Sequence, residues 1–498
     1  MAFTPNEFDE GAEPLIVESP DTSGMPWIPI LWHPCNFDPT NFMDVMLSLI
    51  KNPNLTSSWL VRADILRDEQ DTHHFGSEQP RDASLPNIPI FGGFECKRYF
   101  IRKLIPRNTL RDAPLDQTCL VYESSLVDDE RKTLVVYFPH VSSEENIPFY
   151  HPKVQGIAFL HRWKAADPSP GSISISYLFF PDLAGSNRLM RTALNLLSII
   201  DKHGRGRASG YVKRVHHDLL VPQVPFQDRY AALKLKYAKL IIEGWAESTD
   251  PQKHVFEDLG IAAFLIELWA QMYADSPFPG FVDIGCGNGL LVYILNQEGY
   301  LGWGFDARSR KSWQSYNSQV HISANAQDLL KQLVLVPTVA QPDVASLPTT
   351  LMETDENNIH DGLFPEGTFI ISNHADELTP WTPILATISK CPFMMIPCCS
   401  HNLTGARYRA SAPKDKTKSA STYSSLVSWV TALANDCGWE VETEMLRIPS
   451  TRNTALVGRK RTAESSPPDI THIIQKYGGT DGYFDNAMKL AKKAPRGH

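Results

Sequence analysis

The sequence predicts an α/β protein in two parts, with a mostly parallel, doubly wound sheet in the C-terminal part and a smaller α+β domain before it. From residue 281 to residue 457, short apolar runs alternate with helix-like periodic runs, which is the pattern of parallel strands joined by crossover helices. From residue 91 to residue 225, strand-like runs follow one another with Pro, Gly and Asp turns between them. The change of pattern predicts where the chain divides.

Length and composition set the domain plan. The chain has 498 residues, which is enough for two or three domains and a large core. No run of about 18 apolar residues occurs and the N-terminus resembles neither a signal nor a transit peptide, so no membrane segment is expected. We expect a disordered N-terminus, the α+β domain, the doubly wound domain and a polar tail, over residues 1–25, 26–225, 226–461 and 462–498.

Charge and cysteine usage exclude several classes. The net charge of −9 argues against non-specific binding of nucleic acid. The eight cysteines include no Cys-x-x-Cys pair, which argues against zinc fingers and disulfide scaffolds and predicts no metal site. Cys398 and Cys399 are adjacent in an apolar run, so we expect buried thiols in a reducing compartment, the cytosol.

The predicted elements follow from periodicity and turn residues. In the first domain, helices are predicted at 41–50 and 188–200, and strands at 99–104, 118–122, 134–138, 157–159 and 172–180. Two long helices, 227–247 and 250–273, lead into the second domain. Its strands are predicted at 281–283, 302–305, 320–323, 368–372, 393–397, 439–446 and 454–457, and its helices at 290–295, 326–335, 380–388, 423–435 and 481–492.

The second domain opens with a strand, a glycine-rich turn and a helix, followed by a strand that ends in Asp306. Gly285, Gly287 and Gly289 allow a sharp turn and leave backbone N–H groups bare at a helix N-terminus, where a ligand can lie. Asp306 lies about twenty residues beyond the first glycine, where an acid can accept both ribose hydroxyls of an adenosine cofactor. The alternative is a glycine-rich turn without a ligand, but the register of all five features favours a cofactor.

The spacing of the glycines separates two cofactor classes. A dinucleotide fingerprint needs its third glycine at position 290, which is Leu290. The order Asp-x-Gly-x-Gly-x-Gly from Asp283 is typical of S-adenosylmethionine methyltransferases, where an acid can hold the cationic methionine end. The prediction is therefore a Rossmann-like class I methyltransferase domain that binds S-adenosylmethionine. Its candidate cofactor-binding residues are Asp283, Gly285, Gly287, Asn288, Gly289, Asp306, Asn325, Ala326 and Asn373. For Asn325, a helix cap is an equally weighted alternative.

Polar residues are dense directly after the predicted fourth strand, at 372–377. Such groups at the tip of a buried strand are costly unless they are used. Two carboxylates and a histidine suit the removal of a proton from an alcohol better than methylation of a flat amine, for which Asn-Pro-Pro-aromatic is typical. The candidate catalytic residues are Asp376, Glu377 and His374. The alternative is that Asp376 or Glu377 caps the helix that begins near Pro380.

Three segments, 97–111, 202–217 and 405–418, are locally basic and offer a phosphate-binding surface. Solvated strand edges and loops are an equally weighted alternative for the first two. Arg308 and Lys311 follow Asp306 and could reach phosphate, or Lys311 could be a base if burial lowered its pKa; a solvated helix start is the alternative. The candidate nucleic-acid-binding residues are Arg102, Lys103, Arg107, Lys213, Arg214, Arg308, Lys311, Arg407 and Arg409.

Several motifs carry a resemblance to a known family. In the second domain they are Thr-Asp-Pro-Gln-Lys-His-Val-Phe-Glu-Asp at 249–258, Asp-Ile-Gly-Cys-Gly-Asn-Gly-Leu-Leu-Val-Tyr-Ile-Leu at 283–295, Gly-Phe-Asp-Ala-Arg-Ser-Arg-Lys-Ser-Trp at 304–313, Asn-His-Ala-Asp-Glu-Leu-Thr-Pro-Trp at 373–381 and Ile-Pro-Cys-Cys at 396–399. Upstream are Leu-Ile-Pro-Arg-Asn at 104–108 and Gly-Tyr-Val-Lys-Arg-Val at 210–215. In this order they resemble the tRNA uridine-44 2′-O-methyltransferase family.

The resemblance implies 2′-O-methylation of uridine 44 in serine tRNA, with S-adenosylmethionine as methyl donor. It implies that residues 283–289 and 306 serve the cofactor and that residues 373–377 serve the acceptor. The basic segments would then hold the backbone and shape of the tRNA. Two alternatives stay open: a methyltransferase for another RNA or for protein, and a non-catalytic RNA-binding protein that kept the fold.

Overall fold

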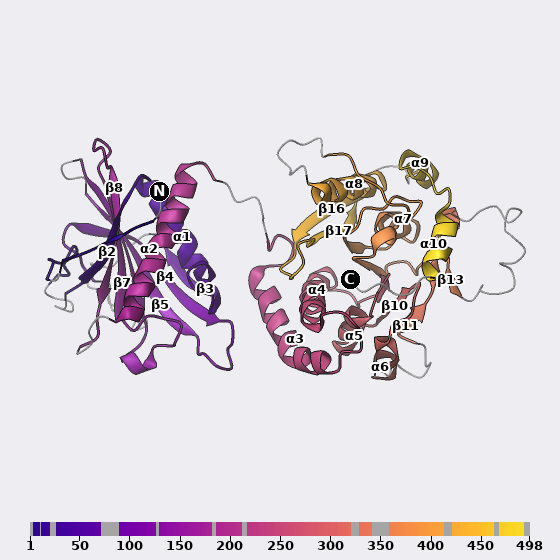
Figure 1. Ribbon diagram of the computed structural model, residues 1–498, viewed down its shortest axis with the longest axis horizontal. Helices are drawn as coiled ribbons and strands as arrows, with labels where there is room; N and C mark the ends of the chain where they lie inside the picture. Colours follow the sequence, from indigo (N-terminus) through magenta and orange to yellow (C-terminus); the bar gives the residue numbers. More distant parts are fainter. Residues whose placement is uncertain are drawn as a thin grey trace, which may run out of the picture. The chain divides into compact units, whose positions relative to one another are not determined.

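The computed structural model describes residues 3–9, 11–19, 26–70, 89–125, 129–181, 186–211, 217–319, 328–340, 358–412, 421–462 and 468–492. The chain divides into two compact units, Met1–Lys213 and Arg214–His498, both drawn in Figure 1. We describe each unit by itself. Among the described helices, none combines the length and the apolar character that a membrane span needs.

Within its described residues, the first unit contains an antiparallel sheet of eight strands in the order β1-β2-β8-β7-β6-β5-β4-β3. The strands are β1 (Asn6–Glu7), β2 (Ile28–Cys35), β3 (Leu60–Glu69), β4 (Phe94–Pro106), β5 (Leu115–Ser124), β6 (Arg131–Pro139), β7 (Gly156–Trp163) and β8 (Gly171–Leu178). The helical segments are α1 (Pro39–Lys51), η1 (Pro53–Leu55), η3 (Glu144–Asn146) and α2 (Asn187–Ala208). Each of the five predicted strands overlaps an observed one.

Apolar side chains alternate between the two faces of this sheet. Phe100 and Val121 belong to the cluster that α1 and α2 cover. Their sequence neighbours Tyr99 and Leu120 belong to a second cluster on the other face, which Trp27 completes. This period of two is what a strand buried on both faces produces.

Part of the N-terminus that the sequence predicts as disordered is ordered. Asn6 and Glu7 pair with Trp32 and Leu31 of β2. Glu18 forms a β-bridge with Phe91. The pairing with β2 makes β1 an edge strand of the sheet, which the acidic, proline-bearing sequence does not predict.

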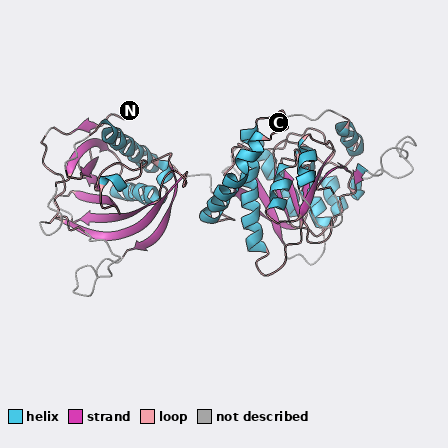
Figure 2. Ribbon diagram, turned by 90° about the horizontal axis from the view of Figure 1, so that it is seen from below, coloured by secondary structure: helices cyan, strands magenta, loops and turns pink. Residues whose placement is uncertain are grey.

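The described part of the second unit contains a sheet of seven strands in the order β11-β10-β9-β14-β15-β17-β16, with helices on both sides (Figure 2). Neighbours from β11 to β15 are parallel, and β17 runs antiparallel to β15 and β16. This confirms the predicted mostly parallel, doubly wound sheet. Its strands are β9 (Phe281–Ile284), β10 (Gly302–Asp306), β11 (Leu330–Gln332), β14 (Phe369–Asn373), β15 (Phe393–Ile396), β16 (Trp439–Met445) and β17 (Thr454–Arg461), and β12 (Val334–Leu335) pairs separately with β13 (Ile359–His360).

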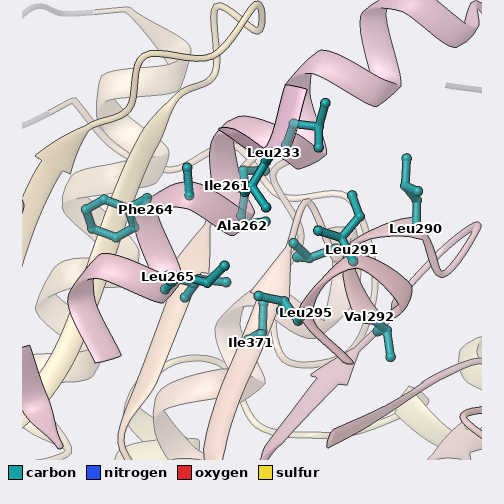
Figure 3. Packing of buried hydrophobic residues seen from close by; sticks show 14 of the residues in the cluster. Leu233, Ile261, Ala262, Phe264, Leu265, Leu290, Leu291, Val292, Leu295 and Ile371 are labelled. Carbon is teal, nitrogen blue, oxygen red and sulfur yellow. The ribbon is translucent and has the colours of Figure 1, made fainter. Parts of the chain in front are cut away.

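The helices of this unit are α3 (Gln223–Glu243), α4 (Pro251–Met272), α5 (Leu290–Gln297), α6 (Ser312–Gln319), η4 (Thr338–Ala340), η8 (Asp376–Trp381), α7 (Thr382–Ile388), α8 (Thr422–Asp436), α9 (Ile470–Lys476) and α10 (Tyr483–Ala491). The core beside α4 is shown in Figure 3, where Leu265 of α4, Leu295 of α5 and Ile371 of β14 lie close together. The start of α4 lies close to the start of the predicted helix over 250–273, and it is fixed by Asp250, whose side chain accepts the N–H of Gln252. Packing of α4 on the sheet holds its first turns beside the strand ends.

The boundary between the units lies after Lys213, whereas the sequence predicts it after residue 225. The segment before α3 belongs to the second unit because Glu444 of β16 binds it. The Glu444 carboxylate accepts the N–H groups of Asp218, Leu219 and Leu220 at 2.7–2.9 Å.

The predicted helix over 326–335 is wrong in its described part, which forms β11 and β12. Leu330 and Val334 are buried, and β11 pairs in parallel with β10 at the edge of the sheet. Short apolar runs do not separate a strand from a buried helix by periodicity alone. The predicted strand at 320–323 lies outside the described residues.

Candidate active site

A cavity of about 1540 Å³ lies at the carboxyl ends of β9, β10, β14 and β15. The sheet reverses its strand order between β9 and β14, and open α/β sheets bind ligands in the crevice at such a point. Four segments at the ends of these strands supply much of the lining, together with four residues at the start of α4: residues 285–288, 305–311, 373–378 and 398–401, and Lys253, His254, Glu257 and Asp258.

The glycine turn after β9 forms one wall of the cavity. Gly285, Gly287 and Gly289 have φ angles of 72°, 55° and 77°, which favour glycine. A Cβ at Gly285 would lie 3.0 Å from the Cβ of Ala375, and one at Gly289 would lie 2.3 Å from Leu330. A Cβ at Gly287 would have nothing within 4 Å, so this glycine leaves room for a ligand.

Asp306 lines the cavity at the end of β10. One carboxylate oxygen accepts the N–H of Gly287 at 3.2 Å, and the other accepts the N–H of Arg308 at 3.1 Å. Burial raises the pKa of this carboxyl, and the charge of Arg310 opposes the rise. The two backbone contacts hold Asp306 beside the glycine turn, where the sequence predicts ribose recognition.

Asp283 lies behind the glycine turn rather than on the cavity surface. Its residue is 1% exposed, and its Oδ1 has no hydrogen-bond partner in the described part of the chain. Burial raises the pKa of the Asp283 carboxyl well above its usual value, and the charges of Asp258 and Asp306 add to the rise. Crowded, poorly paired carboxyls are costly, so a cation bound nearby would be stabilised.

Two further acids, Glu257 and Asp258 of α4, line the same cavity. Burial, followed by the charge of Glu257, raises the pKa of Asp258 to about 8. Burial also acts to raise the pKa of Glu257, but the hydrogen bond and charge of His374 outweigh it and lower the pKa. Neither acid is among the site residues predicted from the sequence, although two adjacent acids inside an apolar helix are a usable signal.

The tip of β14 is tied to α4 through both acids. The side-chain amide of Asn373 donates to Asp258 Oδ1 at 3.4 Å, and Nε2 of His374 lies 3.1 Å from Glu257 Oε1. His374 has a φ of 53°, a conformation that costs free energy in a residue with a side chain. The contact of Asn373 ties the tip of β14 to α4, and the contact of His374 with Glu257 holds the His374 ring at the cavity.

Asp376 and Glu377 also line the cavity, and neither is the N-cap of a helix. The N-cap of η8 is Ala375, without a side-chain hydrogen bond, and that of α7 is Trp381, so the capping alternative is wrong. Burial raises the pKa of the Glu377 carboxyl. The Sγ of Cys398 donates to Asp376 Oδ1 at 3.0 Å.

The expectation that Cys398 and Cys399 are buried thiols is wrong, because both are half-buried and line the cavity. A hydrogen bond from Cys398 is the largest of the effects that together lower the pKa of Cys399 to about 7. Arg452 donates from Nη1 to the carbonyl oxygen of Cys398, and the same nitrogen lies 3.6 Å from the Sγ of Cys399. The apolar run before these cysteines ends with β15, so they follow the strand instead of lying inside it.

Four predicted basic residues, Arg308, Lys311, Arg407 and Arg409, line the cavity. Lys311, Arg407 and Arg409 are exposed. Since Lys311 is exposed, the burial that would make it a base is absent. The cavity therefore has acidic side chains near the glycine turn, and its exposed basic side chains, Lys311, Arg407 and Arg409, are in contact with solvent.

The predicted role of Arg102 in nucleic-acid binding is wrong. The residue is 4% exposed, and its guanidinium donates to Gln117 Oε1 and to the carbonyl oxygens of Leu49 and Ile50. A strand pattern cannot tell which basic residue turns inward to bind the end of a helix. Lys103 and Arg107 on the same strand and its end remain accessible, with Lys103 3.8 Å from Asp116.

The remaining predicted residues divide into three groups. Of the residues predicted to bind the cofactor, Gly285, Gly287, Asn288, Asp306 and Asn373 line the cavity, whereas Asp283 and Gly289 lie behind the turn. Asn325, Ala326, Lys213 and Arg214 lie outside the described residues.

The residues around the glycine turn fit S-adenosylmethionine. The space at Gly287 and the cavity-lining carboxylate of Asp306 match a ligand with a ribose. Behind the turn, the buried Oδ1 of Asp283 has no hydrogen-bond partner among the described residues, and a positive charge on the ligand would stabilise this carboxyl. Residues 220–331 match the family model described as "Predicted AdoMet-dependent methyltransferase". The chain is therefore an S-adenosylmethionine-dependent methyltransferase.

Full-length relatives identify the family. A tRNA (uracil-O(2)-)-methyltransferase of Neurospora crassa is 57% identical over 98% of both chains. Proteins of the same name from Schizosaccharomyces pombe and Saccharomyces cerevisiae are 41% and 38% identical, over 96% and 93% of this chain and 95% and 92% of theirs. Residues 6–214 match the model "TRM44-like, N-terminal bet v1-like domain". The chain belongs to the tRNA (uracil-O(2)-)-methyltransferase family, as the sequence motifs predict.

Asp258 gives a testable pH dependence. Its pKa of about 8 means that it binds a proton at neutral pH, and a cationic ligand favours the ionised form. S-adenosylmethionine should therefore bind more tightly as pH rises from 6 toward about 8, with proton release, and Asp258→Asn should flatten the dependence. Calorimetry in buffers of different ionisation enthalpy measures the released proton; an identical pH profile for both proteins contradicts the assignment.

The raised pKa of Asp258 also predicts that the unliganded protein becomes less stable as pH rises, while its affinity for the cofactor increases. The folded pKa of Asp258 is raised above an unfolded value of about 3.9, so its contribution favours the unliganded fold at low pH and is lost as pH rises toward about 8. Asp258→Asn should consequently raise the Tm of the unliganded protein at pH 8 relative to wild type, while the difference narrows at pH 5. A lower Tm at pH 8 would contradict the burial of an unfavourable charge.

Proposed function

We propose that this protein transfers the methyl group of S-adenosylmethionine to the 2′-oxygen of uridine 44 in serine tRNA. The names and full-length similarity of the relatives support a tRNA uridine acceptor, and the sequence motifs between residues 249 and 399 support the position and the isoacceptor. The structural observation that carries the proposal is the His374–Glu257 pair at 3.1 Å, which faces the same cavity as the glycine turn and Asp306.

The acceptor is an alcohol, so the site must remove a proton as the new bond forms. S-adenosylmethionine supplies an electrophilic methyl group on a sulfonium. His374 is the proton acceptor that the geometry favours: with Nε2–H donating to Glu257, Nδ1 is the nitrogen left to take the proton of the 2′-hydroxyl. Glu257 orients the ring and stabilises the imidazolium that forms.

The other two candidates fit the role of base less well. Asp376 accepts the thiol of Cys398, and burial raises the pKa of Glu377, which favours its protonated form. We place Glu377 beside the acceptor as a group that orients the ribose, and Asp376 among the residues that follow β14 at the same cavity. The exposed Arg407 and Arg409 on the cavity would contact flanking phosphates.

A single-atom change in the substrate tests the proposal. A serine tRNA carrying 2′-deoxyuridine at position 44 should accept no methyl group, while the same tRNA with 2′-deoxyuridine at another site in the variable arm should be methylated at the rate of the unmodified molecule. Equal transfer to both would exclude the 2′-oxygen of residue 44. Full transfer to other tRNAs or to protein would support a different acceptor.

The first unit should bind tRNA phosphates through Lys103 and Arg107. Changing both to glutamate should weaken tRNA binding and reduce the slope of log K against log salt by roughly 0.9 for each duplex phosphate that the protein no longer neutralises. Lys153→Glu is the matched control, because Lys153 is also an exposed lysine of this unit in an ion pair, with Glu144. An unchanged salt slope in the double variant would indicate that this strand edge is an ordinary solvated surface that does not bind tRNA.

A further inference from the structure

Three potential metal ligands meet in the cavity at the ends of β14 and β15. One carboxylate oxygen of Asp376 and the Sγ atoms of Cys398 and Cys399 all lie within 4.8 Å of one another. The strands bring them together: Asn373 pairs with Ile396 in parallel register, so Asp376 and Cys398 each follow within three residues of that pair. The grouping comes from the fold, since Asp376 and Cys398 are 22 positions apart in the chain.

The ligand atoms of these three residues favour one type of metal ion. Two thiols and one carboxylate suit Zn²⁺, whereas Mg²⁺ and Ca²⁺ take oxygen ligands only. With Zn–S near 2.3 Å and Zn–O near 2.1 Å, ligand atoms around one tetrahedral ion are roughly 3.4–3.8 Å apart, which the present cluster can reach by small side-chain movements.

The surroundings match the charge of such a site. Zn²⁺ with two thiolates and one carboxylate has a net charge of −1, and Arg452 places a guanidinium nitrogen 3.6 Å from the Sγ of Cys399. Outer groups that hydrogen-bond to metal ligands orient those ligands and tune the bound metal. Three protein ligands leave a fourth position, and the three residues line the cavity.

We propose that Asp376, Cys398 and Cys399 bind one Zn²⁺ ion whose fourth position is open to the cavity. Each thiol loses its proton to solvent as it binds, and the open position takes an oxygen ligand, either water or a hydroxyl group of the substrate. The ion lies among residues that follow β14 and β15, separate from the glycine turn that serves the cofactor. The binding of Zn²⁺ does not depend on the identity of the RNA acceptor.

Metal analysis of the full chain, purified under reducing conditions without chelators, tests the site. Wild type should contain about one Zn²⁺ per chain, and Cys398→Ser and Cys399→Ser should each lose most of it. Cys96→Ser is the matched control, because Cys96 is a half-buried thiol of the first unit and belongs to no such group among the described residues; it should retain the ion.

Cobalt replacement gives a second readout that requires no methylation. Co²⁺ should produce thiolate-to-metal absorption in wild type and in Cys96→Ser, and none in the double variant Cys398→Ser, Cys399→Ser. S-adenosylmethionine binding and thermal unfolding should be retained in the double variant, which separates loss of the metal from loss of the fold. A wild-type protein that takes up neither Zn²⁺ nor Co²⁺, or a double variant with the metal content of wild type, overturns the assignment.

Discussion

Replacing Asp306 with alanine is expected to weaken S-adenosylmethionine binding by about 100-fold, because two hydrogen bonds from ribose hydroxyls to a carboxylate contribute together about 3 kcal/mol or more. The carboxylate already faces the cavity and is held by the N–H groups of Gly287 and Arg308. Calorimetry or equilibrium dialysis measures the affinity directly. tRNA affinity, measured without cofactor, should change little because Asp306 carries no positive charge.

The matched control for this experiment is Glu440→Ala, which removes an exposed carboxylate of β16 outside the cavity. It should bind the cofactor as wild type does. Equal losses of cofactor and tRNA affinity in Asp306→Ala would indicate a general loss of the fold. Wild-type cofactor affinity in Asp306→Ala would show that Asp306 does not bind the cofactor.

Replacing His374 with alanine is expected to lower the rate of methyl transfer by about 10²–10⁴-fold, the usual contribution of a general base. Cofactor affinity should be nearly unchanged, since the hydrogen bond of His374 goes to Glu257 and His374 is not among the predicted cofactor-binding residues. Single-turnover assays with bound cofactor and saturating tRNA isolate the chemical step. Glu257→Gln should lower the same rate by a smaller factor, because the ring stays in place but its imidazolium is less stabilised.

The pH profile distinguishes a base from a structural residue. A general base acts only in its unprotonated form, so the pH dependence that the base gives the wild-type rate should be lost in His374→Ala. His254→Ala is the control, since His254 lines the same cavity and stacks on Trp245. A wild-type profile in His374→Ala, or an equal loss in His254→Ala, would contradict the assignment of the base.

The glycine turn could be predicted because its signals are local. Asp283, the glycines and Asp306 lie within one β-α-β unit. The backbone explains the residue types: the glycines have positive φ angles, two of them closely approach Ala375 and Leu330, and the two acids lie near the ends of β9 and β10. The fourth-strand residues could be predicted for a related reason. Polar groups directly after an apolar run mark the edge of the sheet where its ligands lie.

The rest of the site depends on contacts between distant segments. Glu257 and Asp258 reach the cavity only because α4 packs beside the tip of β14, which lies more than a hundred residues later. Arg102 turns inward because the end of α1 presents carbonyl oxygens to it. The cysteines after β15 approach Asp376 through strand register. Periodicity in one segment contains none of this information.

One cavity is expected to hold the methyl donor beside a ribose oxygen of tRNA, and the chemical position of the transferred methyl group tests this most directly. The purified protein is incubated with total tRNA and methyl-labelled S-adenosylmethionine, and the RNA is then digested to nucleosides, which are separated. We expect the label to be recovered in 2′-O-methyluridine. Label on a base nitrogen or carbon, with none in 2′-O-methyluridine, would contradict the proposed chemistry.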